Sequence, residues 1–294
     1  MTMKNSLQID AHAKINLSLD VTGRRADGYH LVRMVMQALE LHDTLYMEKT
    51  DQPGVQLASD RPELASDRSN LIVRAAELML KKYLPDQGVK IRLEKRIPLA
   101  AGLAGGSADA AAALKGINIL FDLGIKEKEL CRLGVQLGAD VPYCITGGTA
   151  LSEGIGEILT QLPELPHCYI VLGKPAEGMS TAEAYRALDG RRDVQHPDID
   201  GQIRALRKGY LKGVAEKMGN VLEPVTEERH PEVREIRRLL LGAGAEGARM
   251  SGSGPTVFGL FTEESRAKEA CSVLKKEPSR EVILTVPAQN GRNA

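Results

Sequence analysis

The stretch that decides the fold is Pro98-Leu99-Ala100-Ala101-Gly102-Leu103-Ala104-Gly105-Gly106-Ser107-Ala108-Asp109. Its first half is rich in glycine and other small residues. Four alanines follow at 110–113 and favour a helix, because alanine is the best helix former. Ser107 lies at the junction, where a residue that caps the helix is expected. The stretch therefore predicts a glycine loop that leads into the N-terminus of a helix.

A loop of this kind is well suited to binding a phosphate group. Free backbone N–H groups and the positive end of the helix dipole both attract an anion, and glycine lets the backbone approach a ligand closely. No lysine precedes Ser107, so the Walker motif is absent, and so is the G-x-G-x-x-G dinucleotide motif. The alternative interpretation is a tight turn capped by Ser107, and the loop alone does not distinguish the two.

The overall composition limits the classes of function. A length of 294 residues favours two domains, and 39 basic against 39 acidic residues leave no net field to attract nucleic acid or an anionic membrane. No apolar run approaches the roughly 20 residues of a membrane span. The four cysteines are far apart and form no C-x-x-C pair, which favours reduced thiols in the cytoplasm. We expect a cytoplasmic protein that acts on small molecules.

The hydrophobic pattern predicts a mixture of strands and helices. Apolar and polar residues alternate from Lys14 to Val21, as in a half-buried strand, and this alternation places Lys14 and Asn16 on one face. Pro163 and Pro166 bracket the expected boundary between a first domain at 1–162 and a second at 163–294. Further strands are predicted at 32–38, 44–48, 89–97, 169–172, 257–261 and 282–286, and helices at 69–84, 126–137, 181–188, 198–210, 231–241 and 263–276. The fold class is therefore α+β.

The residues available for chemistry favour phosphoryl transfer. The histidines have no metal-ligand spacing, and no G-x-S-x-G motif of a hydrolase occurs. What remains is the phosphate loop, the strand residue Lys14, and Asp140 in the turn Gly138-Ala139-Asp140-Val141-Pro142. Phosphoryl transfer needs a cradle for phosphates, a positive charge, and a carboxylate that takes a proton from the attacking hydroxyl. On its spacing alone, Asp140 is better explained as a turn residue or a helix cap.

The order of five motifs resembles the GHMP kinase superfamily over almost the whole chain, from Ala13 to about Phe261. These motifs are Ala13-Lys14-Ile15-Asn16-Leu17, Gly23-Arg24-Arg25-Ala26-Asp27-Gly28-Tyr29-His30, the loop at 98–109, the turn at 138–142, and Ser251-Gly252-Ser253-Gly254-Pro255. The resemblance implies a two-domain α+β fold. It has an N-terminal GHMP domain with a mixed sheet and a ferredoxin-like C-terminal domain, with the site in the cleft between them.

Two of the motifs point to one branch of the superfamily. The turns at 27–30 and 138–142 resemble those of kinases that use ATP to phosphorylate the 2-hydroxyl of a cytidyl-diphospho sugar alcohol, a step of non-mevalonate isoprenoid precursor biosynthesis. The resemblance implies that Asp140 is the catalytic base and Lys14 its cationic partner. It implies substrate contacts by Asn16, Tyr29, His30, Thr181 and Tyr185, with the two tyrosines sandwiching the cytosine ring and His30 reading its polar edge.

The resemblance also implies an ATP site. It would be made by Asn70, Leu71, Lys95, Pro98, Leu99, Ala100, Ala101, Gly102, Leu103, Ala104, Gly105, Gly106, Ser107 and Ala108. Mg²⁺ is expected with ATP, but the sequence identifies no protein carboxylate as its ligand. Ala101 and Ala104 stand where many members have glycine, so the backbone there must suit alanine or be strained. Ala108 replaces a second serine, which leaves Ser107 as the one side-chain hydroxyl of the loop.

Two other functions remain open at this point. One is a GHMP kinase for another small alcohol, such as homoserine or mevalonate, although a tyrosine beside a histidine in the turn at 27–30 suits a nucleobase better. The other is a nucleotide-binding protein without catalysis, which the presence of both Lys14 and Asp140 disfavours. The sequence leaves the oligomeric state open between a monomer and a weak dimer.

Overall fold

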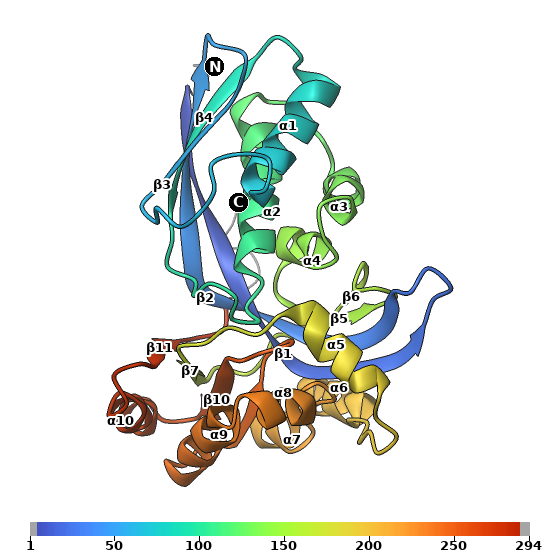
Figure 1. Cartoon of the computed structure of the whole chain (residues 1–294), viewed down its shortest axis with the longest axis vertical. Coiled ribbons are helices and arrows are strands. Elements are labelled where there is room, and N and C mark those ends of the chain that lie inside the picture. Colours follow the sequence, from blue (N-terminus) through green and yellow to red (C-terminus); the bar gives the residue numbers. More distant parts are fainter. Residues whose placement is uncertain (1–4, 289–294) are drawn as a thin grey trace.

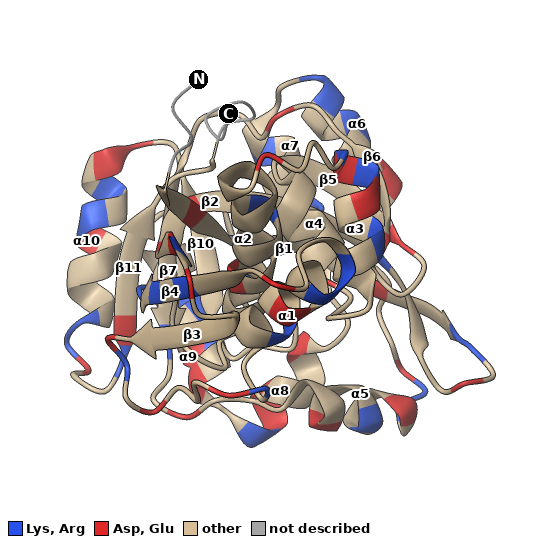
Figure 2. Cartoon of the chain, turned by 90° about the horizontal axis from the view of Figure 1, so that it is seen from above, with Lys and Arg blue, Asp and Glu red and all other residues tan. Residues whose placement is uncertain are grey.

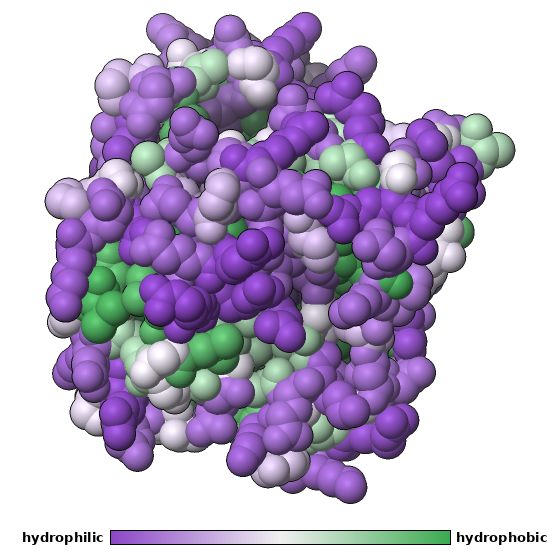
Figure 3. Space-filling model, turned by 60° about the horizontal axis from the view of Figure 1, so that its bottom comes forward, coloured by the Kyte–Doolittle hydropathy of each residue, from purple (hydrophilic) through white to green (hydrophobic). Residues whose placement is uncertain are grey.

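The computed structural model describes residues 5–288, which form a seven-stranded sheet and a four-stranded sheet. Figure 1 shows the first sheet above the second, with helices packed against each. Lys and Arg are mixed with Asp and Glu over the surface in Figure 2, without a region of one sign. The face in Figure 3 is mainly hydrophilic, with hydrophobic residues in separate patches. Within residues 5–288, no helix is long and apolar enough to cross a membrane.

The first sheet is built on two long antiparallel strands, β1 (Ser6–Arg24) and β2 (His30–Thr50). Beyond β2 lie β4 (Gly88–Glu94), which is antiparallel to it, and β3 (Gly54–Ser59), which is parallel to β4. The shorter strand β5 (Thr149–Glu153) pairs with the edge of β2 opposite β1, and β6 (Ile158–Gln161) pairs with β5. Strand β8 (Gly219–Asn220) pairs in parallel with β1. The sheet is mixed, as expected.

Four helices cover one face of the first sheet (Figure 1): α1 (Leu71–Tyr83), α2 (Gly105–Leu120), α3 (Glu127–Val135) and α4 (Val141–Thr146). Helix α2 is the central one, and the alanines at 110–113 are all buried between the sheet and the other helices. Small side chains let α2 lie close to β1. This close packing fixes where the N-terminus of α2 and the phosphate loop before it meet the strand that carries Lys14.

The second sheet is antiparallel, in the order β11 (Glu281–Thr285), β7 (Tyr169–Lys174), β10 (Val257–Phe261) and β9 (Gly247–Met250). Helices α9 (Glu232–Gly242) and α10 (Glu264–Leu274) pack on this sheet. Strand β10 is buried along its whole length, including Phe258 and Phe261. The remaining helices are α5 (Thr181–Asp189), α6 (Ile199–Arg207), α7 (Leu211–Glu216) and α8 (Glu223–Arg229).

Two local predictions are wrong, and the sequence did not predict one short helix. Helix α2 begins at Gly105 after Ala104, whose φ of 57° is left-handed, so Ser107 lies inside the first turn and is not the cap. The strands predicted at 32–38 and 44–48 are one strand, because β2 continues past register irregularities in its pairing with β1. The turn at 138–142 leads directly into the short helix α4, with Pro142 in its first turn, where a missing N–H costs nothing.

Candidate active site

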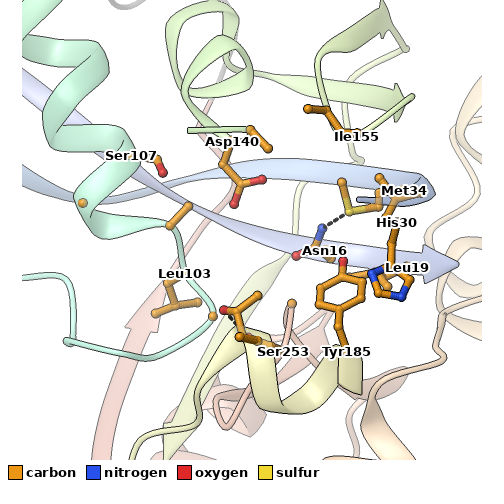
Figure 4. A pocket seen from close by; sticks show the side chains of 18 of the residues that line it. Asn16, Leu19, His30, Met34, Leu103, Ser107, Asp140, Ile155, Tyr185 and Ser253 are labelled. Atoms are coloured by element: carbon orange, nitrogen blue, oxygen red, sulfur yellow. Dashed lines mark hydrogen bonds between the residues drawn. The ribbon is translucent and has the colours of Figure 1, made fainter. Parts of the chain in front are cut away.

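A cavity of about 800 Å³ lies where the phosphate loop, β1, β2, α5 and the loop at 251–254 meet (Figure 4). Most of the predicted site residues line it, although they come from distant parts of the chain. These are Lys14, Asn16, Tyr29, His30, Leu71, Lys95, all residues from Pro98 to Ser107, Asp140, Thr181 and Tyr185. Two predicted residues do not line it. Asn70 caps α1 by accepting the Ile72 N–H at 2.9 Å, and Ala108 is buried inside α2.

The phosphate loop is held in an unusual backbone conformation. Ala100 and Ala104 have φ angles of 49° and 57°, and Gly102 between them has φ of 74°. The prediction for Ala104 is therefore confirmed, whereas Ala100, and not Ala101, is the second alanine with a left-handed backbone. A side chain at Gly102 would collide with the carbonyl oxygen of Ser251. The loop thus depends on glycine at this point, and it presents the unpaired N–H groups of the first turn of α2 to the cavity.

Lys14 and Asp140 meet at the centre of the cavity. The Lys14 ammonium donates to Asn16 Oδ1 at 2.7 Å and to the Gly102 carbonyl at 3.2 Å, and it lies 3.6 Å from Asp140 Oδ2. Lys14 is buried, whereas the Asp140 side chain is 31% exposed. Asp140 occupies the cap position of α4 but makes no capping hydrogen bond with its side chain. Its carboxylate is therefore available to a ligand, beside a fixed positive charge.

Asn16 is oriented from both sides. Its Oδ1 accepts from Lys14, and its Nδ2 donates to the sulfur of Met34 at 3.2 Å, a contact that Figure 4 marks with a dashed line. The backbone N–H of Asn16 donates to Ser251 Oγ at 3.2 Å. Met34 was not among the predicted residues. The alternation of apolar residues predicted that Met34 lies on the apolar face of a strand, but no local signal distinguished it from an ordinary core methionine.

The loop at 251–254 closes the cavity from the second half of the chain. Ser251 Oγ donates to the Gly102 carbonyl at 3.0 Å, and the hydroxyls of Ser253 and Thr181 lie 2.9 Å apart. Asn220 on β8 holds this loop by donating to the carbonyls of Met250 and Gly252, both at 2.8 Å. Sequence reasoning noted the loop as a motif but assigned no role to Ser253. Its contact with the predicted residue Thr181 is visible only in three dimensions.

An aromatic and charged group lies at the other end of the cavity. The rings of His30 and Tyr185 pack with centroids 4.7 Å apart and planes tilted by 31°, whereas Tyr29 is 61% exposed (Figure 4). Burial, together with the charge of Asp140, raises the pKa of Tyr185, so its phenol stays protonated. Asp189 Oδ1 accepts from His30 Nε2 at 2.7 Å. Asp189 was not predicted, because only the fold brings the end of α5 to the start of β2.

Lys95 borders the cavity, but its ammonium is already bound by two carboxylates. It donates to Asp109 Oδ2 at 2.7 Å and makes a short contact with Asp43, and all three side chains are buried. Burial lowers the pKa of Lys95, but its contacts with Asp109 and Asp43 more than offset this effect and raise it. Burial raises the pKa of Asp109 to about 8 in spite of the lysine. Lys95 therefore anchors the base of the phosphate loop.

The described residues hold no group of three or more His, Cys, Asp or Glu side chains that could bind a metal ion. A magnesium ion that accompanies ATP does not require one, because Mg²⁺ keeps several waters and takes most of its protein-site ligands from substrate phosphates. The Ser107 hydroxyl, in the first turn of α2, and the Asp140 carboxylate, at the start of α4, both line the cavity. This oxygen donor set fits a phosphate-bound Mg²⁺.

The sequence matches two models of one family. Residues 70–148 match the GHMP kinases N terminal domain, and residues 202–280 match the GHMP kinases C terminal. Two curated relatives are named 4-diphosphocytidyl-2-C-methyl-D-erythritol kinase. The relative from Acetivibrio thermocellus is 49% identical over 92% of this chain and 95% of its own length, and the one from Lachnospira eligens is 47% identical over 95% and 98%.

Solved structures give the same fold. A crystal structure of 4-(cytidine 5'-diphospho)-2C-methyl-D-erythritol kinase superposes with a TM-score of 0.81 at 33% identity, covering 97% of this chain and all of the other. A homoserine kinase from Cytophaga hutchinsonii superposes with a TM-score of 0.80 at 22% identity, over 98% of this chain and 96% of the other. At 22% identity, the similarity to the homoserine kinase shows the fold alone.

Proposed function

The chain belongs to the 4-diphosphocytidyl-2-C-methyl-D-erythritol kinases of the GHMP family, and we propose how its residues carry out the reaction of that family. It is an ATP-dependent small-molecule kinase of isoprenoid precursor biosynthesis by the non-mevalonate pathway. We infer that the γ-phosphoryl group of ATP passes to the 2-hydroxyl of the cytidyl-diphospho sugar alcohol, giving the 2-phosphate and ADP. Both substrates are small molecules, and the reaction needs a base, a cation and a phosphate cradle in one cavity.

Asp140 takes the role of general base. Its carboxylate has no capping bond to satisfy and lies where a hydroxyl can donate to it. As the oxygen attacks the γ-phosphorus, the proton passes to Asp140. Lys14, 3.6 Å away, places a positive charge beside this carboxylate and orients the hydroxyl, and Asn16 holds the lysine in place. Because the Lys14 ammonium is already bonded to Asn16 Oδ1 and the Gly102 carbonyl, the side chain loses little conformational freedom when the substrate binds.

The loop at 98–108 binds the phosphates of ATP. It has no Walker lysine, so backbone N–H groups and the dipole of α2 hold the anion together with Mg²⁺. Mg²⁺ would supply charge neutralisation when bound with ATP, and Ser107 would be the residue of the loop whose side chain holds it. Leu71 and Lys95 line the cavity beside the loop and would border the adenosine, whereas Asn70 acts through the start of α1.

The aromatic end of the cavity binds the cytosine. Tyr185 is fixed by its contact with His30, and the exposed Tyr29 is free to cover the opposite face of the base. Stacking of this kind is worth about 1–3 kcal/mol per base. Thr181 precedes Tyr185 by one turn of α5 and directs its hydroxyl toward Ser253, so it contacts the part of the substrate nearer to Asp140.

One observation carries this proposal: the Lys14–Asp140 pair opens into the same cavity as the phosphate loop and the stacked His30 and Tyr185. The test is release of ADP from ATP in the presence of the cytidyl-diphospho sugar alcohol, homoserine or mevalonate, each alone. We expect ADP release with the cytidyl compound, at a rate at least 100-fold above the other two. Turnover of homoserine or mevalonate alone would overturn the assignment, and ATP binding without turnover of any alcohol would favour a non-catalytic role.

We further propose that the enzyme works in the cytoplasm as a monomer or weak dimer, with no nucleic-acid partner. The four cysteines are all free thiols, and burial raises the pKa of Cys131 to about 11, so that thiol is unreactive. A sedimentation experiment between 1 and 100 μM protein tests the oligomeric state. A stable tetramer at the lowest concentration would contradict it.

A further inference from the structure

Three polar side chains, Asp189, His30 and Arg24, form a chain of contacts at the aromatic end of the cavity. Asp189 Oδ1 accepts from His30 Nε2 at 2.7 Å, and Asp189 Oδ2 lies 3.3 Å from Arg24 Nη1. These residues sit at the end of α5, the start of β2 and the end of β1, respectively, and all three line the cavity. Tyr185, one turn earlier on α5, packs on the His30 ring. Helix α5 therefore holds the imidazole both by its face and by one nitrogen.

The contact with Asp189 selects one tautomer of His30. An ionised carboxylate can only accept hydrogen bonds, so the His30 nitrogen that faces it, Nε2, must carry a hydrogen. In a neutral imidazole the other nitrogen then has a lone pair and accepts. Among residues 5–288, no side chain or backbone group is bonded to His30 Nδ1. The ring thus has one nitrogen committed to the protein and a second that is free to accept from a ligand.

We propose that Asp189 is a specificity-determining positioning residue: by fixing the tautomer of His30, it makes Nδ1 an acceptor for the exocyclic amine of the substrate base. This inference rests on the proposed function, in which the aromatic end binds cytosine. Cytosine carries an amine at the position where uracil carries a carbonyl oxygen. An acceptor on His30 attracts the first and repels the second, so the tautomer distinguishes the two bases.

Arg24 has a supporting part in this arrangement. Its guanidinium lies on the second oxygen of Asp189, and its Nε donates to the Gly28 carbonyl at 3.1 Å within the turn that carries Tyr29. The carboxylate is therefore held in one rotamer, with Oδ1 directed at His30. Asp27 and Arg186 also line this end of the cavity, but neither is bonded to the imidazole.

The test is the variant Asp189→Asn, which keeps the size of the side chain but can offer an N–H to the ring, so that His30 can adopt the opposite tautomer. Steady-state kinetics are measured with the cytidyl-diphospho substrate and its uridyl counterpart. We expect the preference for cytidyl over uridyl, as a ratio of kcat/KM, to fall by roughly 10- to 100-fold, with the change in KM rather than kcat. Asp193→Asn is the matched control, since Asp193 is exposed and forms an ion pair with Arg191, away from His30, and it should keep the preference.

A second measurement reads the tautomer itself. The ¹⁵N shifts of the His30 ring, assigned by their loss in His30→Gln, should show the Nε2–H form in the wild type and a shift toward Nδ1–H in Asp189→Asn. A structural role for Asp189 would lower the thermal stability without changing these shifts or the base preference. An unchanged preference in a folded Asp189→Asn, or the Nδ1–H form in the wild type, would overturn the inference.

The two proposals fail in different ways. If the wild type phosphorylates neither the cytidyl nor the uridyl compound, the proposed function is wrong and the base-reading role fails with it. If the wild type phosphorylates the cytidyl compound and Asp189→Asn does so with the same selectivity, only the role of Asp189 is wrong.

Discussion

Asp109 lies in an environment that the sequence does not suggest. It lies in the second turn of α2, accepts from Lys95 through Oδ2, and leaves Oδ1 buried without a hydrogen-bond partner among the described residues. Two carboxylates, Asp43 and Asp109, share the single ammonium of Lys95. Taking a second negative charge out of water costs more than one lysine returns, so Asp109 retains its proton at neutral pH.

This environment predicts a stability that depends on pH. Burial raises the pKa of Asp109 from its ordinary value near 4 to about 8 in the folded chain. Between about pH 4 and pH 8 the folded state therefore holds a proton that the unfolded state has lost. The contribution of Asp109 to the free energy of unfolding is fully present below about pH 4 and declines as the pH rises to 8. Asp109→Asn has no such proton. We expect its melting temperature, relative to the wild type, to rise between pH 5 and pH 8.5.

The comparison uses thermal melts of both proteins across this pH range. Asp86→Asn, at an exposed position, is the control for a simple change in net charge. A difference between Asp109→Asn and wild type that stays constant with pH would show that Asp109 is ionised in the fold and that its pKa is not raised.

Among the elements, the phosphate loop is the one that depends most on another part of the chain. The Gly102 carbonyl accepts from both Lys14 and Ser251, and its α-carbon lies against the Ser251 backbone. The loop from the first sheet and the loop after β9 thus fix each other. The phosphate loop could not hold its conformation by local preference alone, because Ala100, Gly102 and Ala104 have positive φ.

Gly102→Ala should disrupt this junction. The added Cβ meets the backbone of the 251–254 loop, which cannot move without breaking the hydrogen bonds of Ser251 Oγ with the Asn16 N–H and the Gly102 carbonyl. We expect the KM for ATP to rise by at least roughly tenfold and kcat to fall. Gly124→Ala is the matched control, since Gly124 also has positive φ but open space around it. It should lose only the roughly 1–2 kcal/mol of a left-handed alanine and keep its KM. Equal kinetics in the two variants would contradict this account.

The sequence predicted regular elements better than it predicted junctions. Strand β10 runs from Val257 to Phe261 as the apolar run indicates, and α1 ends where Pro85 requires. Ser107 failed as a cap because the left-handed Ala104 starts α2 earlier, a conformation that favours glycine and that alanine propensity does not indicate. Lys14 and Asp140 were found through their motifs. Ser253, Met34 and Asp189 were missed, because their importance arises only from contacts between distant segments.

At the scale of the whole molecule, the segment at 286–288 is joined to the first sheet. After β11, the Val286 carbonyl accepts from the Glu40 N–H at 3.0 Å and the Ala288 N–H donates to the Ala38 carbonyl at 2.9 Å. On the edge of β1 that faces away from β2, strand β8 pairs with β1. Segments of the second half thus extend the sheet of the first. The boundary at residues 162 and 163 stays a prediction, because the units it separates share these contacts.

This junction predicts the effect of a truncation. A chain that ends at Thr285 loses both backbone hydrogen bonds, whereas a chain that ends at Ala288 keeps them. Two such bonds contribute about 1–3 kcal/mol, so we expect the shorter chain to melt roughly 3–8 °C below the chain that ends at Ala288. Calorimetry of the two truncated proteins measures this difference. Identical melting temperatures would show that the junction contributes nothing to stability.

The arrangement of both halves around one cavity assigns the chemical step to Asp140, and one measurement tests this directly. It compares wild type and Asp140→Asn in a single turnover with ATP and the cytidyl-diphospho sugar alcohol, following the new phosphate ester by ³¹P NMR. The account predicts a rate lower by roughly 10²–10⁴-fold in the variant, the usual loss for a general base, with ATP affinity within about threefold of the wild type. A variant that forms the 2-phosphate at a rate near that of the wild type would contradict the account.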